Sequence, residues 1–130
     1  METRVLIVDV DRKVHDRLSR ALSFTGALVF GASDRETALH QVRRVQPDLI
    51  ILDISSPDSD RWETLFEIRK LPYIPVIALT TPDDVNSIVE SLRYGADYSM
   101  TKPVRERELR ARIRALLRRS RRAASAKVAA

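Results

Sequence analysis

Short apolar runs alternate with helical patterns along the chain. The runs cover residues 5–8, 28–30, 49–52 and 75–79, and a shorter one fits residues 98–101. An unbroken run such as Leu49–Leu52 is typical of a strand buried on both faces, as in a parallel sheet. Because a helical pattern follows every run, we predict an α/β fold, a (βα)₅ doubly wound parallel sheet with helices on both faces.

Between and after the predicted strands, apolar side chains recur at helical spacing. The five stripes are Val14, Leu18, Ala21 and Leu22; Ala38, Leu39, Val42 and Val45; Trp62, Leu65, Phe66 and Ile68; Val85, Ile88, Val89 and Leu92; and Leu109, Ile113, Leu116 and Leu117. We expect these stripes to face the core. Ser33–Glu36 is predicted to form a capping box, Pro82 to lie in the first turn of the fourth helix, and Gly95 to end that helix.

The composition excludes several classes of site. A chain of 130 residues suits one domain, and the absence of cysteine excludes a disulfide scaffold, a thiolate metal site and a cysteine nucleophile. The two histidines, His15 and His40, are too few for a histidine-rich metal cluster and are predicted to be ordinary surface residues. No apolar run approaches the ~20 residues that cross a bilayer, so we expect a cytoplasmic protein with no membrane partner.

The formal net charge of +5 is unevenly distributed. From Arg105 onward the chain has ten basic and two acidic residues, whereas residues 1–104 have thirteen basic and sixteen acidic ones. Such a basic segment is typical either of a nucleic-acid contact or charged interface, or of a solvated helix face. We predict a domain over residues 1–119 and an Arg/Ala-rich flexible tail, or the start of a linker, over residues 120–130.

Chemically active side chains follow four of the predicted strands. Asp9 and Asp11 follow the first, Asp53 ends the third, Thr80 follows the fourth and Lys102 follows the fifth. Because ligands bind at the carboxyl ends of parallel strands, we expect these residues to converge. Carboxylates held close together need a cation, and oxygen ligands of this kind suit Mg²⁺. A lysine and a hydroxyl beside them could hold phosphoryl oxygens.

Several short motifs occur in a characteristic order and spacing. They are Val5–Asp9, Pro47–Asp53, Pro57, Pro75–Thr80, Gly95–Asp97 and Thr101–Pro103, followed by the basic helix Glu108–Arg119. In these motifs the chain resembles the receiver domain (CheY-like) of two-component response regulators, and most closely the receivers of the OmpR-like winged-helix class. The resemblance covers roughly residues 4–119 and implies a flavodoxin-like sheet of order 2-1-3-4-5 with five helices.

The resemblance also implies roles for the residues at the strand ends. Asp53 would accept a phosphoryl group from a sensor histidine kinase, and Thr80 and Lys102 would hold that group. Mg²⁺ would be bound by Asp9, Asp53 and the backbone carbonyl of Ser55, with Asp11 as a further candidate. Pro103 would follow a cis peptide bond. The domain would act in signalling, not as an enzyme, by switching the surface of its fourth helix, fifth strand and fifth helix.

The chain departs from the receiver pattern at three positions. Val10 stands where a second acid, normally a direct metal ligand, is expected, and Arg61 stands where a glycine is expected. Ser99 replaces the aromatic switch residue, and Tyr98 lies one position earlier. These departures support an alternative, a degenerate receiver that acts as a dimerisation or docking module without phosphorylation.

A second alternative is a phosphatase of the haloacid-dehalogenase type. The first strand followed by Asp9 and Asp11 resembles its nucleophile motif, in which Asp9 would be the nucleophile and Asp11 the general acid. That family needs a further pair of acids after another strand, and only Glu106 and Glu108 follow Lys102, on a helix. This alternative also leaves Asp53 without a role, so we rank it below the receiver.

The fourth and fifth helices suggest a homodimer. In OmpR-like receivers a surface of the fourth helix, fifth strand and fifth helix pairs an apolar centre with crossing charges. The positions that match this pattern are Asp97, Glu108, Arg112, Arg114 and Arg119. The simpler interpretation is that the arginines only solvate the last helix. No helix-turn-helix or wing is present, so DNA would be reached only through an effector domain absent from this chain.

Overall fold

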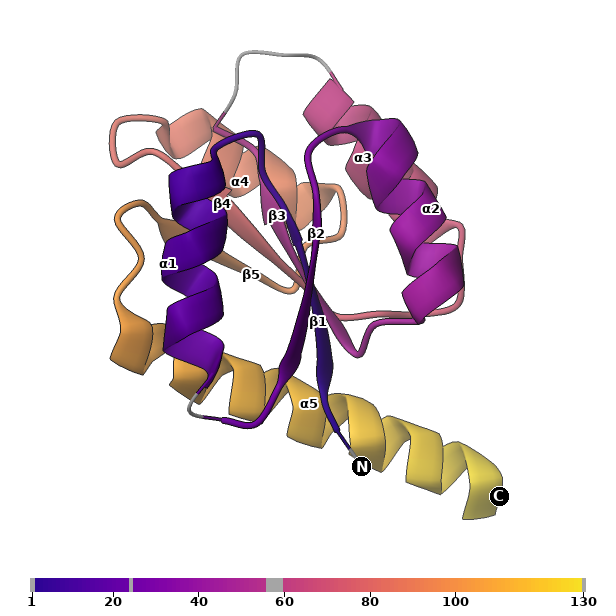
Figure 1. Cartoon of the computed structure of the whole chain (residues 1–130). Coiled ribbons are helices and arrows are strands. Elements are labelled where there is room, and N and C mark those ends of the chain that lie inside the picture. Colours follow the sequence, from indigo (N-terminus) through magenta and orange to yellow (C-terminus); the bar gives the residue numbers. More distant parts are fainter. Residues whose placement is uncertain (1, 24, 56–59, 130) are drawn as a thin grey trace.

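The computed structural model describes residues 2–23, 25–55 and 60–129, and in them a central sheet is flanked by helices (Figure 1). The strands are β1 (Arg4–Val8), β2 (Leu28–Ala32), β3 (Leu49–Asp53), β4 (Val76–Thr80) and β5 (Tyr98–Thr101). The helices are α1 (Arg12–Ser23), α2 (Arg35–Val45), α3 (Asp60–Arg69), α4 (Val85–Arg93) and α5 (Glu106–Ala129). All strand pairs are parallel and the order is β2-β1-β3-β4-β5, which confirms the predicted fold.

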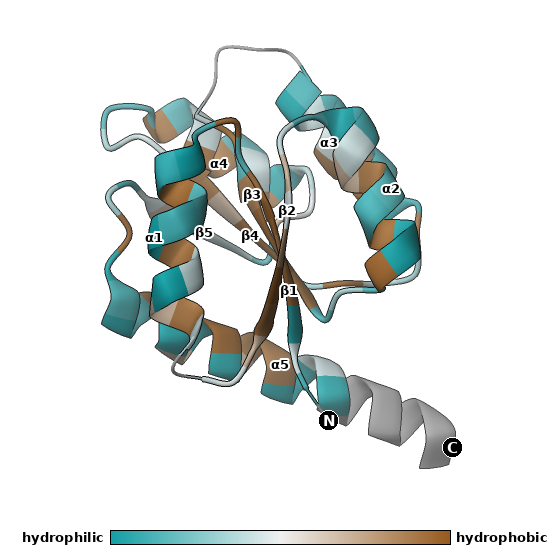
Figure 2. Ribbon diagram, in the orientation of Figure 1, coloured by the Kyte–Doolittle hydropathy of each residue, from teal (hydrophilic) through white to brown (hydrophobic). Residues whose placement is uncertain are grey.

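The strands are buried on both faces, and Figure 2 shows them as the hydrophobic centre of the molecule. Because successive side chains of a strand point to opposite faces, each strand contributes to two cores. In β1, Val5 and Ile7 belong to the core beneath α1 and α5, whereas Leu6 and Val8 belong to the core beneath α2 and α3. This double burial explains why the strands have unbroken apolar sequences.

The sheet brings the ends of its central strands to one edge. β3 lies between β1 and β4, with Val8 opposite Leu52 and Asp53 opposite Leu79. The chain runs from β1 outward to β2 and then back across to β3, so the strand order reverses there. A reversal of this kind opens a crevice at the carboxyl ends of the strands, where α/β proteins bind ligands.

Two helix starts differ from the prediction. The residue that caps α2 is Asp34, whose Oδ1 accepts a hydrogen bond from Thr37 N at 2.7 Å, while Thr37 Oγ1 accepts one from Asp34 N at 3.3 Å. The capping box therefore lies one residue later than predicted. Helix α4 begins at Val85, after Pro82, because Asp84 accepts a hydrogen bond from Ser87 N at 3.0 Å. Gly95 follows the end of α4 with φ +109°, as its predicted role requires.

The apolar stripe of α4 does not face the core, contrary to the prediction. Val85, Val89 and Leu92 are 64%, 51% and 48% exposed, whereas Ser87 and Ser91 are buried. The helix packs against β4 and β5 with these small polar side chains inward. Phe66 of α3 is likewise exposed, although the other three residues of its stripe pack on the core.

Helix α5 extends past the domain boundary predicted at residue 119 and continues to Ala129. The predicted tail is therefore helical over most of its length. Pro57, which contributed to the resemblance, lies outside the described residues.

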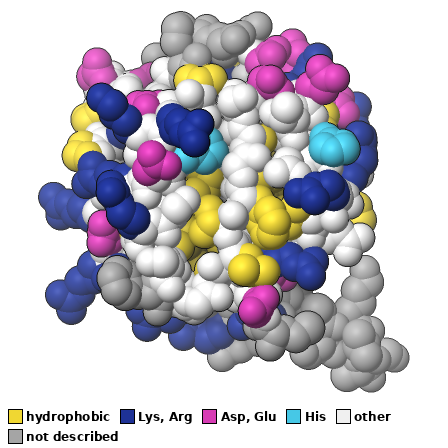
Figure 3. Space-filling model, viewed as in Figure 1, with side chains coloured by type: hydrophobic (Ala, Val, Ile, Leu, Met, Phe, Trp, Pro, Cys, Tyr) yellow, Lys and Arg dark blue, Asp and Glu magenta, His cyan; other side chains and the backbone are white. Residues whose placement is uncertain are grey.

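On the face drawn in Figure 3, acidic side chains gather at the upper right, over the beginnings of α2 and α3. Glu36 lies in the first turn of α2, and Asp60 and Glu63 lie in that of α3. Negative charge is favourable there because the N-terminus of a helix carries partial positive charge. These acids therefore stabilise helix ends and need no ligand to explain them.

Candidate functional site

Two buried carboxylates share one ammonium group at the edge of the sheet. Lys102 Nζ lies 3.0 Å from Asp9 Oδ2 and 3.0 Å from Asp53 Oδ1. Asp9 directly follows β1, Asp53 ends β3, and Lys102 directly follows β5, so the parallel strands place all three side chains. The predicted convergence of these residues is confirmed, and the lysine keeps the two carboxylates from repelling each other.

The hydroxyl of Ser55 binds both the Lys102 ammonium and the Asp53 carboxylate, which the sequence did not predict. Lys102 Nζ donates to Ser55 Oγ at 3.2 Å, and Ser55 Oγ donates to Asp53 Oδ1 at 2.5 Å. The backbone N–H of Ser55 also donates to Asp53 Oδ1, at 2.9 Å. Oδ1 of Asp53 is therefore fixed by Lys102 and by two donors of Ser55.

Lys102 remains protonated in this setting. Burial alone would lower the pKa of its ammonium group, but the neighbouring Asp9 and Asp53 carboxylates outweigh burial and raise that pKa above its usual 10.5. The site therefore has a fixed positive charge at every physiological pH. A fixed charge of this kind can stabilise negative charge that develops on a phosphoryl group.

Thr80 ends β4, the strand next to β3, and its hydroxyl has no partner among the described residues. Its side chain is fully buried at the end of β4, and Oγ1 has no hydrogen-bond partner in the described part of the chain. Its backbone is firmly held, since Lys102 N donates to Thr80 O at 2.7 Å. A buried hydroxyl without a hydrogen bond costs roughly 1–3 kcal/mol, so it is a candidate to bind a ligand oxygen.

The predicted Mg²⁺ site is only partly assembled. The exposed Asp11 carboxylate accepts from Lys13 N at 2.9 Å and so caps α1, and the side chain of Val10 is exposed. Within residues 2–23, 25–55 and 60–129, no group of three or more acidic or histidine side chains is arranged to hold a metal ion. Asp9 and Asp53 are both paired with Lys102, so among the described residues two of the predicted ligands are in place but no metal site is preformed.

His15 contacts the backbone of this pocket and is not the ordinary surface residue that the sequence predicted. Its Nε2–H donates to the backbone carbonyl of Asp9 at 2.8 Å, and its ring lies against Gly31, where a Cβ would be only 3.0 Å from the ring. Asp9 is further held because Asp11 N donates to its Oδ1 at 2.8 Å. The backbone around the Asp9 carboxylate is thus fixed from both α1 and β2.

Three of the residues predicted for a dimer interface have contacts within the chain. Asp97 Oδ2 accepts from Val76 N at 2.8 Å and pairs with Arg69 at 3.4 Å, so this carboxylate is used inside the chain. Glu108 accepts from the Tyr98 hydroxyl at 3.1 Å, and the Arg112 guanidinium lies 4.1 Å above the Tyr98 ring.

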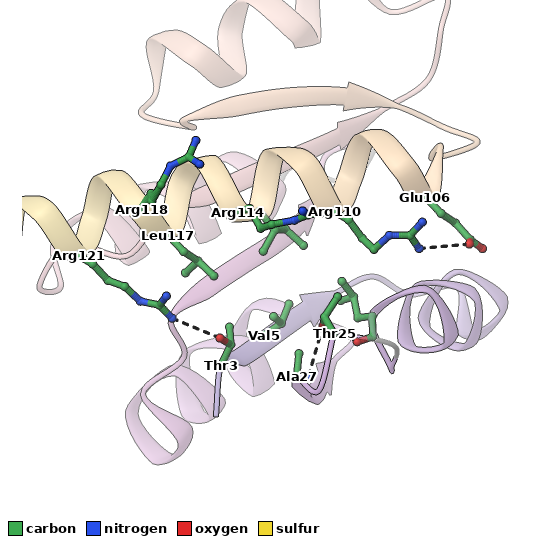
Figure 4. A pocket seen from close by; sticks show the side chains of 12 residues that line it. Thr3, Val5, Thr25, Ala27, Glu106, Arg110, Arg114, Leu117, Arg118 and Arg121 are labelled. Atoms are coloured by element: carbon green, nitrogen blue, oxygen red, sulfur yellow. Dashed lines mark hydrogen bonds and ion pairs between the residues drawn. The ribbon is translucent and has the colours of Figure 1, made fainter. Parts of the chain in front are cut away.

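The remaining two arginines lie further along α5. Arg119 is exposed, and Arg114 lines a groove between α5 and the start of β1 (Figure 4). Glu108 and Arg112 thus both contact Tyr98 of β5, and whether the five positions meet a second copy stays a prediction.

That groove is the larger of the two cavities, about 940 Å³, and it lies at the start of β1, whereas Asp9 follows the end of that strand. In Figure 4 its cations are seen to be partly engaged: Arg110 pairs with Glu106 at 3.8 Å, and Arg121 donates to Thr3 Oγ1 at 3.4 Å. A smaller cleft of about 130 Å³ opens over Asp9 and Asp53. This smaller cleft is the candidate site, because the buried Asp9 carboxylate and the Asp53 carboxylate that share Lys102 line it.

None of the helices described is both long and apolar enough to cross a membrane.

Comparisons with known proteins agree with this geometry. The family model of the response regulator receiver domain matches residues 5–114. The chain is 43% identical over 121 residues to a probable transcriptional regulator, ycf27, of Guillardia theta, across 93% of this chain and 48% of that protein. It is 43% identical over 118 residues to the response regulator MprA of Mycobacterium leprae, across 90% of this chain and 52% of that protein.

Solved structures give the same result. A two-component response regulator from Clostridium difficile has a TM-score of 0.84 at 30% identity, over 92% of this chain and 98% of that one. The chain spans about half the length of the curated relatives it matches. Because the family model covers most of the chain and the relatives share its fold, the chain belongs to the receiver-domain family of two-component response regulators.

Proposed function

We propose that Asp53 accepts a phosphoryl group from a sensor histidine kinase. Receivers of this family are in general signalling domains without enzyme activity, and phosphoryl acceptance is their standard function. The observation that carries the proposal here is the position of Asp53, a buried carboxylate bonded to Lys102 at the strand edge where Thr80 has an unpartnered hydroxyl. A buried carboxylate and a buried free hydroxyl are both costly unless they have a use.

The geometry favours Oδ2 of Asp53 as the attacking oxygen. Three donors hold Oδ1, whereas Oδ2 has no hydrogen-bond donor among the described residues. Oδ2 would attack phosphorus, the bond from phosphorus to the donor atom would break, and the leaving group would depart with its electron pair. Lys102 and the Thr80 hydroxyl would then bind oxygens of the new acyl phosphate.

Receivers typically bind Mg²⁺ at their acidic pocket. Here Asp9, Asp53 and the backbone carbonyl of Ser55 remain as candidate ligands. Because Val10 supplies no acid and Asp11 caps α1, we assign no step of the transfer to the metal.

Intact-mass spectrometry after incubation with acetyl phosphate tests the assignment of Asp53. We expect one added phosphoryl group on the natural chain and none on Asp53→Asn, which has nearly the same volume. The matched control is Asp48→Asn, because Asp48 accepts from the Arg4 backbone N–H at the opposite end of β3. Labelling that persists in Asp53→Asn would contradict the proposal, and labelling of neither chain would favour the unphosphorylated docking module.

We further propose that phosphorylation acts on the surface formed by α4, β5 and α5. Thr80 is linked to β5 by its carbonyl, which accepts from Lys102 N, and by its register with Thr101. A hydroxyl that turns toward a phosphoryl oxygen would therefore disturb the start of the loop to α4. The exposed apolar residues of α4 give this surface an apolar centre that favours association. The proposed partner is a second copy of the chain.

The phosphatase alternative has less support. Its proposed general acid, Asp11, is an exposed residue whose carboxylate is occupied by the backbone of α1. The chain spans about half the length of these relatives, of which one is named a probable transcriptional regulator. For the present chain we propose no direct DNA contact.

A further inference from the structure

The groove between α5 and the start of β1 has a cationic rim. It is lined by Arg110, Arg114, Arg118 and Arg121, and among its described lining residues Glu106 is the only acid. Successive arginines are three or four residues apart, which is about 4.5–6 Å along the helix axis. Because 3.6 residues make one helical turn, all four lie on one side of α5. The groove therefore has a row of positive charges along its whole length.

Two of these arginines have no partner within the described part of the chain. Arg110 and Arg121 each make one contact, drawn as a dashed line in Figure 4. Arg114 and Arg118 are exposed, and neither makes a hydrogen bond or an ion pair with a described residue. Like charges four residues apart on a helix repel each other. Negative charge bound in the groove would relieve this repulsion.

The groove also presents apolar atoms between its charges. Ile113 and Leu117 of α5 line it together with Val5 and Leu22, and each of the four is at most 7% exposed, so they form its floor. Figure 4 shows Leu117 pointing from α5 toward the side on which Val5 lies. The hydrocarbon stems of the arginines extend this apolar surface. A phosphodiester backbone gains nothing from such a floor, whereas an amphipathic helix can bury its apolar face there and set carboxylates against the rim.

The groove and the phosphoacceptor cleft lie at opposite ends of β1. Val5 lines the groove, whereas Asp9, four residues further along the chain, lines the cleft. At ~3.3 Å per strand residue, the two positions are about 13 Å apart. A protein that delivers a phosphoryl group must reach the cleft, so the groove is available to a different partner at the same time.

We propose that this groove binds an acidic amphipathic helix of a partner protein. Carboxylates at positions i and i+4 of such a helix are ~6 Å apart along its axis, which matches the spacing of Arg110, Arg114 and Arg118. Apolar side chains on the adjoining face of the helix lie over Ile113 and Leu117. Each exposed ion pair contributes little, so the charges orient the helix and the apolar contact supplies the remaining affinity. The inference does not depend on phosphorylation.

Fluorescence anisotropy of a labelled helical peptide, with glutamates one turn apart on one face and leucines on the adjoining face, tests the proposal. The natural chain should bind it saturably. The double variant Arg114→Glu with Arg118→Glu should bind it at least roughly tenfold more weakly, because two attractions are replaced by two repulsions. The matched control has the same net charge: Arg12→Glu with Arg44→Glu changes two exposed arginines, on α1 and α2, and should bind as the natural chain does.

Two altered peptides separate the contribution of charge from that of the apolar face. Glutamine in place of every glutamate should weaken binding to the natural chain at least roughly tenfold, and binding of the acidic peptide should weaken as NaCl is raised. Serine in place of every leucine should also weaken binding, since the floor then has no apolar partner. Asp53→Asn should bind the acidic peptide within about twofold of the natural chain, because the groove lies at the other end of β1.

Each contrary result overturns the proposal. No saturable binding of the acidic peptide, or equal binding of the glutamine peptide, would show that charge complementarity does not operate here. Equal loss in the two double variants would mean that only net charge matters. A short DNA duplex that binds more tightly than the peptide, and is lost with Arg114→Glu and Arg118→Glu, would make the groove a nucleic-acid contact. Circular dichroism checks folding, and should the double variant not fold, Arg114→Gln alone should weaken peptide binding about twofold.

Discussion

Helices α2 and α4 have similar sequence patterns, but the apolar stripe of α2 faces the sheet and that of α4 faces solvent. Each is amphipathic and each begins after an aspartate that caps its first turn. Helix α2 buries Ala38 and Val42 of its stripe against the sheet, whereas α4 buries serines and exposes its valines. Helical periodicity therefore identifies a helix and its apolar face, but it does not say whether that face meets the sheet or solvent.

The difference shows how each helix is held. Helix α2 is held by apolar burial, and it also packs against α3. Helix α4 is held by polar contacts at its ends and by two small serines, of which Ser91 donates to Ile88 O at 2.8 Å within the helix. With little apolar area buried, an element opens locally at low free energy. This makes α4 suited to a switch and α2 to a fixed support.

The largest expected effect comes from placing a carboxylate on the apolar stripe of each helix. Val42→Asp would bury an unpaired charge and should lower the free energy of unfolding by more than about 4 kcal/mol. Val89→Asp on the exposed stripe of α4 should change it by less than about 0.5 kcal/mol. Urea unfolding of both variants measures the contrast, and equal losses would show that α4 also packs its stripe inward.

A second substitution tests the buried side of α4 directly. Ser91 is fully buried, so Ser91→Leu inserts a large side chain into a filled space and should destabilise the fold by about 2 kcal/mol, as measured by urea unfolding. The matched control is Asn86→Leu, which places the same leucine on the exposed part of the same helix and should be near neutral. If Ser91→Leu instead stabilised the protein, the observed orientation of α4 would be wrong.

The fold could be predicted because its determinants are local. Runs such as Leu49–Leu52 identify strands, and the carboxyl ends of parallel strands must meet at one edge. That rule alone predicted that Asp9, Asp53 and Lys102 would converge. The start of α2 was misplaced by one residue because Ser33 and Asp34 are both good caps, and the choice between them depends on Thr37.

The details of the site depend on side-chain directions, which a linear pattern does not contain. The Ser55 hydroxyl reaches both Asp53 and Lys102, but its sequence position implied only a backbone carbonyl ligand. Asp97 was assigned to an interface, and the structure adds a bond from Val76 N to its carboxylate that the sequence did not indicate. Arg61 was noticed as a departure from the family pattern, and only the structure shows that it lines the cleft with Asp9 and Asp53.

A smaller effect is expected at the exposed face of α4, where the apolar stripe would pair with a second copy. We expect weak self-association, because each exposed charge pair contributes only ~0.2–1 kcal/mol and the apolar centre must supply the rest. Arg112→Glu should weaken the dimer by less than about tenfold and make it less sensitive to salt. Sedimentation at high protein concentration measures this. A monomer throughout, unaffected by Arg112→Glu, would remove the dimer and leave α4 exposed.

The smallest effect concerns the polar anchor that follows α4. Asp97 lies just beyond the helix, and its Oδ1 accepts a hydrogen bond from the Tyr73 hydroxyl. Burial, and then the hydrogen bond and charge of Asp97, raise the pKa of Tyr73 from 10.0 to about 12. The folded state thus holds this proton more tightly than the unfolded chain does. The stabilisation is complete below about pH 10 and is lost as the pH rises through about 12.

Two variants isolate this anchor from Lys102, whose raised pKa changes stability in the same direction. The phenolate absorbance of the natural chain minus that of Tyr73→Phe reports Tyr73 and should titrate at about pH 12. When both chains also carry Asp97→Asn, the midpoint of this difference should move back toward pH 10. The free energy of unfolding should also fall less steeply above pH 10 in Tyr73→Phe than in the natural chain. If Asp97→Asn left the titration of Tyr73 unchanged, Asp97 would not be the group that holds the Tyr73 proton.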